Sequence, residues 1–213
     1  MVDPRVIHSI TIEMCTGFLL LSGIAIISKL VADTWLRRLR GHVARFDRWA
    51  ENVSKFAEPA SYFALTAGVL ATFVSMVTGS LAWPVEDLIG SPIVHNKILT
   101  TAASQALFIG AVVLRTRYKA AIWSTRITSL GYSLTVLTGV ALMTLQNSIA
   151  GHLAGKGSLL DDLLHTLNID SHVIWVFPQA ASLILLVAFP LAALAIFLGI
   201  RSASRQTEAP AEA

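Results

Sequence analysis

The chain alternates between long apolar stretches and shorter polar connections rich in arginine. The hydrocarbon core of a bilayer is about 30 Å thick and requires about 20 mainly apolar residues in a helix. Stretches of this kind cover residues 6–31, 59–83, 97–114, 127–149 and 173–200. The pattern predicts an all-α, polytopic membrane protein. Its single helix-bundle domain, residues 1–200, has a four-helix core and an added fifth, C-terminal helix.

The connection over residues 32–58 has a different pattern. Apolar residues recur every three or four positions, and arginines and a lysine fill the positions between them; the apolar set is Trp35, Leu36, Leu39, Val43, Phe46, Trp49, Ala50, Val53 and Phe56. This spacing predicts an amphipathic helix that lies on the membrane surface. Two roles fit it, an interfacial anchor in the lipid bilayer and a docking face for a partner subunit. Its large apolar face argues against nucleic acid as a partner.

Composition supports the membrane class. Hydrophobic residues make up 54% of the chain and charged residues only 14%, whereas soluble domains have about 25% charged residues. So few polar residues would not cover the surface of a soluble fold. The single cysteine, Cys15, excludes an internal disulfide and a zinc site built on several thiolates. Only the polar tail, residues 202–213, is predicted to be disordered.

The basic residues predict the orientation in the membrane. With five spans, 13 of the 16 lysines and arginines fall on the side of the first and third connections and the C-terminus. Positively charged loops face the cytoplasm. We therefore expect a multi-pass protein of the plasma (inner) membrane of a prokaryote, with its N-terminus outside and its C-terminus in the cytoplasm.

Five of the six histidines fall on the predicted outer side, near the ends of different helices; they are His8, His95, His152, His165 and His172. Facing helices of a bundle build cofactor sites from such side chains. His95 and His152, with His8 in reserve, are candidate axial ligands of a b-type haem. The set His8, His95 and His152 is alternatively a candidate site for a metal ion. Each of these histidines also has a simpler interpretation as a polar residue at the membrane interface.

Two charged residues accompany the histidines. Glu13 lies inside the first predicted span, where an ionisable group is expensive and is a functional candidate. Lys97 follows His95 by two residues and is placed to neutralise a haem propionate or to pair with Glu13. Small residues such as Gly68, Gly79 and Gly139 allow close helix packing. Such glycines suit either a plain bundle or one with room for a flat macrocycle.

Several short motifs share positions with one family. His8 opens the first apolar run, Gly79 and Trp83 end the second as Gly-x-x-x-Trp, His95 opens the third, and Thr138-Gly139 precedes a glycine-rich segment at 151–155. In these positions residues 5–165 resemble the predicted inner-membrane domain of unknown function 2231 family. That family's first helix opens with His-Pro-x-x-Val-His-Phe-Pro; here both prolines are missing and Glu13 replaces the second histidine. The resemblance implies a compact four-helix unit in a redox setting, because some members are joined to Rieske or cytochrome-like modules.

Three functions remain open at this point. The first is an integral membrane redox subunit that binds a b-type haem or a metal near the outer face and passes electrons between quinol and an extracytoplasmic redox partner. The second is a cofactor-free structural or assembly subunit of a larger membrane complex. The third is a small transporter or channel. The residues do not define a reaction, so enzymatic activity stays undecided.

Overall fold

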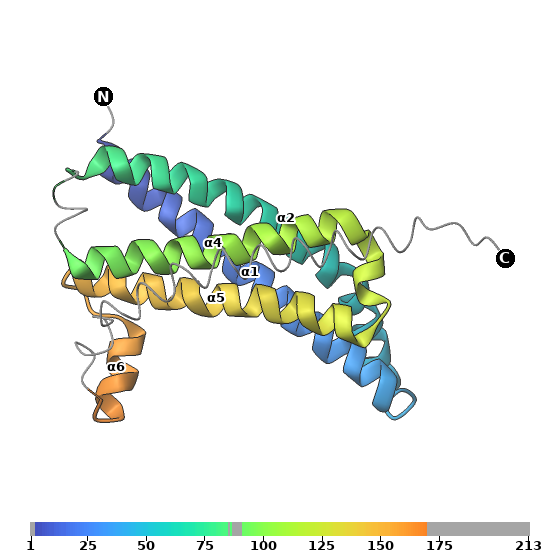
Figure 1. Cartoon of the computed structure of the whole chain (residues 1–213). Coiled ribbons are helices and arrows are strands. Elements are labelled where there is room, and N and C mark those ends of the chain that lie inside the picture. The colour runs from blue at the N-terminus through green and yellow to red at the C-terminus, as the bar shows by residue number, and fades with distance from the viewer. Residues whose placement is uncertain (1–2, 85, 87–90, 170–213) are drawn as a thin grey trace.

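The computed structural model describes residues 3–84, 86 and 91–169, and most of these residues lie in helices (Figure 1). The elements are α1 (Pro4–Arg38), α2 (Ala44–Ala82), α4 (Pro92–Tyr118), the 3-10 turn η1 (Lys119–Trp123), α5 (Arg126–Leu153) and α6 (Leu159–Thr166). The predicted fifth span at 173–200, His172 and the tail at 202–213 lie outside the described residues.

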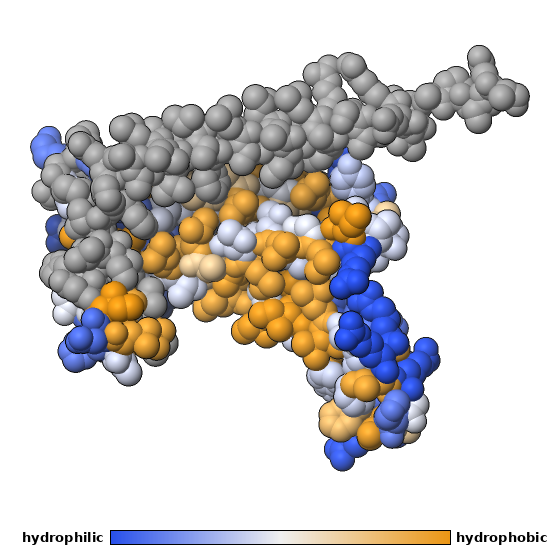
Figure 2. Space-filling model, turned by 60° about the horizontal axis from the view of Figure 1, so that its bottom comes forward, coloured by the Kyte–Doolittle hydropathy of each residue, from blue (hydrophilic) through white to orange (hydrophobic). Residues whose placement is uncertain are grey.

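Four of the helices are long and apolar enough to cross a membrane, at Pro4–Arg38, Ala44–Ala82, Ile93–Trp123 and Arg126–Leu153. Figure 2 shows an apolar belt between hydrophilic ends. Within the described residues these findings confirm the all-α class and place a long apolar helix at each of the first four predicted spans, and each helix is longer than the stretch predicted. With 35 residues α1 is about 52 Å long, well beyond the thickness of a hydrocarbon core.

The helices form two antiparallel hairpins, α1 with α2 and α4 with α5 (Figure 1). The hairpins meet where α1 contacts α5 and α2 contacts α4. The core between them contains Leu19, Ile26, Leu65, Phe108 and Val136. We call the end of the bundle that contains His8, His95 and His152 the histidine end. The opposite end, with residues 38–45 and 115–126, is the arginine end.

A seven-residue repeat of small or polar residues joins α1 to α2. It consists of His8, Cys15, Ser22 and Lys29 in α1, and of Ser54, Ser61, Gly68, Ser75 and Ala82 in α2. Hydrogen bonds cross it: the Ser22 and Ser61 hydroxyls are 3.0 Å apart, and Lys29 Nζ donates to Ser54 Oγ at 3.3 Å. A heptad period is that of a left-handed coiled coil, and small side chains let the two helices approach closely. We call this contact the α1–α2 seam.

Residues 32–58 do not form the separate surface helix that the sequence predicts. Instead α1 continues to Arg38, a turn follows, and α2 runs without a break from Ala44 through Pro59. The reason is that the α1–α2 seam continues past the predicted spans. Ala50 and Ala57 are buried, and the centroids of the Trp35 and Phe46 rings are 5.4 Å apart. Pro59 removes only one hydrogen bond from the helix, and its ring is exposed, so it does not disturb the packing between helices.

The α1–α2 hairpin extends beyond the α4–α5 hairpin at the arginine end (Figure 1). The end of α4 is fixed along α2 by the Thr116–Tyr62 hydrogen bond of 2.8 Å, and η1 meets α1 where Trp123 lies 4.8 Å from Lys29 Nζ. We call the residues beyond these contacts, 30–57, the arm. Its α2 part, residues 44–57, is about 21 Å long. In Figure 2 the arm is a largely hydrophilic limb that projects from the apolar belt.

Candidate functional site

His8 joins α1 to α2 at the histidine end. Its ring is partly buried, and Nδ1 lies 2.9 Å from the Ser75 carbonyl oxygen and 3.4 Å from Thr78 Oγ1. Because a carbonyl oxygen only accepts, Nδ1 is the protonated nitrogen in this contact. Gly79 makes the room, since a Cβ there would stand 2.7 Å from His8 Cε1. His8 therefore has a structural role in the α1–α2 seam, and in the neutral ring its Nε2 carries the lone pair.

Lys97 and Glu13 take different places around His8. Lys97, near the start of α4, is partly buried and close enough to act electrostatically on His8. Glu13 is exposed on the side of α1 that faces away from the other described helices. Among the described residues the ion pairs are Lys29–Asp33, Arg40–Glu51 and Arg115–Glu58, so the expected Lys97–Glu13 pair is not formed.

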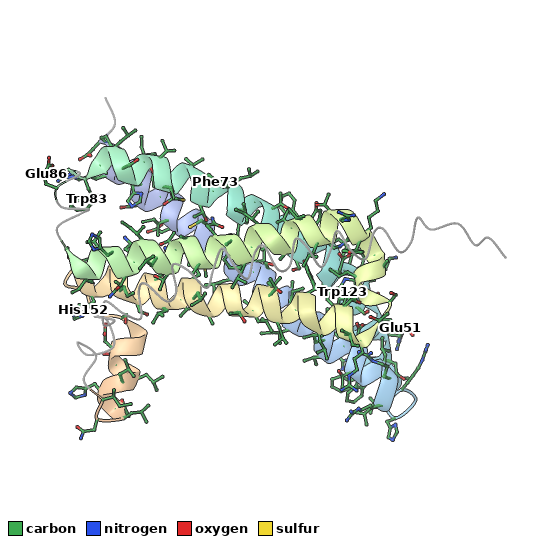
Figure 3. All side chains as sticks on the ribbon, viewed as in Figure 1. Glu51, Phe73, Trp83, Glu86, Trp123 and His152 are labelled. Carbon is green, nitrogen blue, oxygen red and sulfur yellow. The ribbon has the colours of Figure 1, made fainter. Side chains whose placement is uncertain are left out.

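His95 and His152 lie at the same level of neighbouring helices. His95 is the fourth residue of α4 and is exposed, while His152, near the end of α5, is partly buried. The contact of Ile93 with the Ile149 cluster shows that these two helix ends meet. His165 lies on α6, which packs on the same cluster through Leu164. His8, His95, His152 and His165 therefore lie on helices that share one end of the bundle, where Figure 3 labels His152.

The structure does not assemble them into a metal site. Among the described residues no three His, Cys, Asp or Glu side chains are close enough together to hold a metal ion, so His8, His95 and His152 do not form a three-ligand site. Ile93 and Ile149 bring α4 and α5 into contact near His95 and His152, and a haem between these two histidines stays a prediction. Deeper in the bundle, Phe108 lies against Gly139 and Leu19 lies against Gly68. Side chains fill the space that these glycines leave.

Two partly buried ion pairs at the arginine end were not identified from the sequence. Arg115 of α4 donates to Glu58 of α2, and both side chains are at least 85% buried, with exposures of 15% and 13%. Lys29, which is 8% exposed, lies 3.2 Å from Asp33 and packs on the Trp123 ring. The signal was present, because Glu58 precedes one predicted span and Arg115 follows the next. Antiparallel neighbours bring such positions together.

The arm has an uneven distribution of free charge. Each of its acids has a partner: Asp33 binds Lys29 and Ser54, Asp47 accepts from the Trp35 indole and the Gly41 backbone, and Glu51 binds Arg40. The exposed Arg38, Arg45 and Arg48 form no ion pair within the described part of the chain. They lie close in sequence to an exposed aromatic stripe of Phe46, Trp49 and Phe56.

Comparison with known proteins finds no matching family model, no matching curated protein and no matching solved structure. The resemblance to the inner-membrane domain family therefore stays a prediction.

Proposed function

We propose that this protein is a structural or assembly subunit of a larger membrane complex, and that it uses the arm to dock a partner subunit on the cytoplasmic side. The observation that favours this function is the surface of the arm. It projects beyond the rest of the bundle and exposes Phe46, Trp49 and Phe56 together with arginines that have no acidic partner among the described residues. Aromatic residues and arginine are enriched in protein interfaces.

The arm is built to hold this surface in a fixed geometry. The Trp35 indole donates to Asp47 at 3.0 Å and thereby ties the two helices together next to the turn. The Gly41 backbone, with a φ of 91°, donates to the same carboxylate at 2.9 Å and fixes the turn itself. A preformed surface loses little conformational entropy on binding. Its excess positive charge suits a partner segment that is acidic and amphipathic.

The test compares complexes extracted with a mild detergent from membranes of the source organism. The arm variant combines Arg45→Glu, Arg48→Glu and Trp49→Ala, whereas the control combines Arg117→Glu and Arg126→Glu, exposed residues at the same end but outside the arm. We expect the wild type and the control to migrate above the mass of one chain, and the arm variant to migrate as a single chain. A wild type that migrates alone, or an arm variant that keeps its partner, would contradict the proposal.

The other interpretations stay predictions. A redox subunit with a b-type haem requires a Soret band in the purified protein, and a metal site requires metal in elemental analysis. A transporter or channel requires solute flux into vesicles that contain the protein. The arm proposal does not depend on any of these measurements, because the docking surface lies at the other end of the bundle from His8, His95 and His152.

A further inference from the structure

Glu13 lies on the face of α1 that no other described helix covers. On the opposite side α1 contacts α2 through the seam, and toward α5 it uses Thr16, which is 3.2 Å from Asn147, and Gly23, which packs on Val140. The open face is a stripe at helical spacing: Ile10, Glu13, Gly17 and Ile24, all exposed. Glu13 is the one ionisable residue in an otherwise apolar stripe.

This carboxyl group lies within the membrane span. The Arg5 guanidinium stacks over Trp83 at 5.4 Å, and an exposed tryptophan with a cationic neighbour is typical of the membrane interface. Glu13 follows Arg5 by eight residues, about 12 Å farther along the helix axis. Ionisable side chains at such depth face protein or water rather than lipid, because their transfer into hydrocarbon is costly. The position of Glu13 therefore calls for a polar neighbour.

Gly17 provides a place for that neighbour to approach. It lies one turn from Glu13, and nothing stands within 4 Å of the position that its Cβ would occupy. The glycines of α1 and α2 that face other helices behave differently: a Cβ at Gly23 would meet Val140 at 3.0 Å, and one at Gly68 would meet Leu19 at 2.6 Å. An open glycine on a membrane helix permits close contact with another helix.

We infer that the Glu13–Gly17 face of α1 binds a transmembrane helix of the partner subunit, with a lysine, arginine, histidine, asparagine or glutamine at the level of Glu13. This inference rests on the proposed function, since it requires a complex. Charge complementarity selects a helix with a donor over a second copy of this chain. A two-fold contact through this face would place two Glu13 carboxyl groups against each other, and like charges resist such pairing.

The first experiment measures the amount of complex in membranes of the source organism after mild solubilisation. Every variant in this experiment keeps the wild-type arm. We expect Glu13→Leu and Gly17→Leu to reduce the amount of complex about tenfold or more, equivalent to a loss of about 1.4 kcal/mol. Glu13→Gln keeps an acceptor but removes the charge, and it should retain more of the complex than Glu13→Leu. Gly131→Leu is the matched control, because Gly131 is an exposed glycine of α5 with nothing within 4 Å of its Cβ position.

A second experiment tests the donor directly with the full-length protein in phosphatidylcholine vesicles. The probes are two synthetic leucine-rich transmembrane helices, one with a single lysine at the depth of Glu13 and one without it. Energy transfer between labelled protein and labelled helix reports association. We expect the lysine helix to bind the wild type about tenfold better than the leucine helix, and this preference to disappear in Glu13→Leu.

The outcomes separate this inference from the proposed function. If the arm variant loses its partner while Glu13→Leu and Gly17→Leu keep it, the inference is wrong and the function stands. If the wild type migrates as a single chain, both are wrong. A wild-type species with the mass of two chains, or a crosslink from position 13 to residues 173–200 of the same chain, would show a different occupant and overturn the inference.

Discussion

Single residues set how closely the two helices of the first hairpin approach. A Cβ at Gly68 would stand 2.6 Å from Leu19 Cγ and 3.3 Å from the Leu19 backbone nitrogen, which has no freedom to move away. We expect Gly68→Ala to lower the free energy of unfolding by about 1–3 kcal/mol, the usual cost of overpacking. Gly131→Ala, where nothing stands within 4 Å, should be neutral or stabilise by up to about 1 kcal/mol. Denaturant titration in micelles measures both, and equal effects would contradict the packing argument.

His8 and Glu13 show how far the candidate site was predictable from sequence. The depth of each residue followed from its distance to a helix end, and His8, His95 and His152 do lie at one end of the bundle. The direction of each side chain did not follow. His8 and Glu13 are five residues apart, so their side chains point in directions that differ by about 140° around the helix axis. The side of α1 on which α2 packs decides that His8 faces inward and Glu13 outward. That side is set by the α1–α2 seam, a tertiary contact.

At the scale of elements, the seam also explains why the first connection was misjudged. Its polar and basic residues indicated a separate surface helix, whereas the seven-residue repeat of small or polar side chains continues from the membrane span to Ser54 in the arm. Small residues give a weak hydrophobic signal, so the repeat is visible only when two helices are aligned. The four apolar spans were predictable because about 20 apolar residues have few alternatives to a membrane helix.

The register of the seam can be tested with cysteine pairs. The Ser22 and Ser61 hydroxyls are 3.0 Å apart, so Ser22→Cys with Ser61→Cys should form a disulfide on mild oxidation. Ser22→Cys with Ser75→Cys is the control, because Ser75 lies two heptads away beside His8. Electrophoresis after protease cleavage between α1 and α2 reads the crosslink. Crosslinking of the control pair, or of neither pair, would refute this register.

The contact between α2 and α4 relies on the Arg115–Glu58 pair. Its side chains are 15% and 13% exposed, so the pair is poorly screened and each partner is costly to leave alone. A double-mutant cycle with Glu58→Gln and Arg115→Gln should give a coupling of about 1–3 kcal/mol in the free energy of unfolding. The Arg40–Glu51 pair, at 68% and 50% exposure, is the comparison and should couple by less than about 1 kcal/mol. Couplings of equal size would show that burial does not strengthen the inner pair.

For the whole molecule, the orientation in the membrane decides which partners can reach which end. The arginine end contains the exposed arginines of the arm and of residues 115–126, and positively charged loops stay in the cytoplasm. Single cysteines at His42, on the exposed turn of the arm, and at Lys156, exposed at the histidine end, report the two sides. Cys15 is buried and serves as the internal blank.

A membrane-impermeant maleimide applied to intact cells should label Lys156→Cys and should label His42→Cys only after the membrane is permeabilised. The reason is that moving the arm outside would carry most of the described positive charge across the membrane. The reverse labelling would place the arm outside and remove the cytoplasmic partner from the proposed function. The Glu13–Gly17 face lies within the span in either orientation, so the experiments on this face would remain valid. The arm would then need an extracytoplasmic partner.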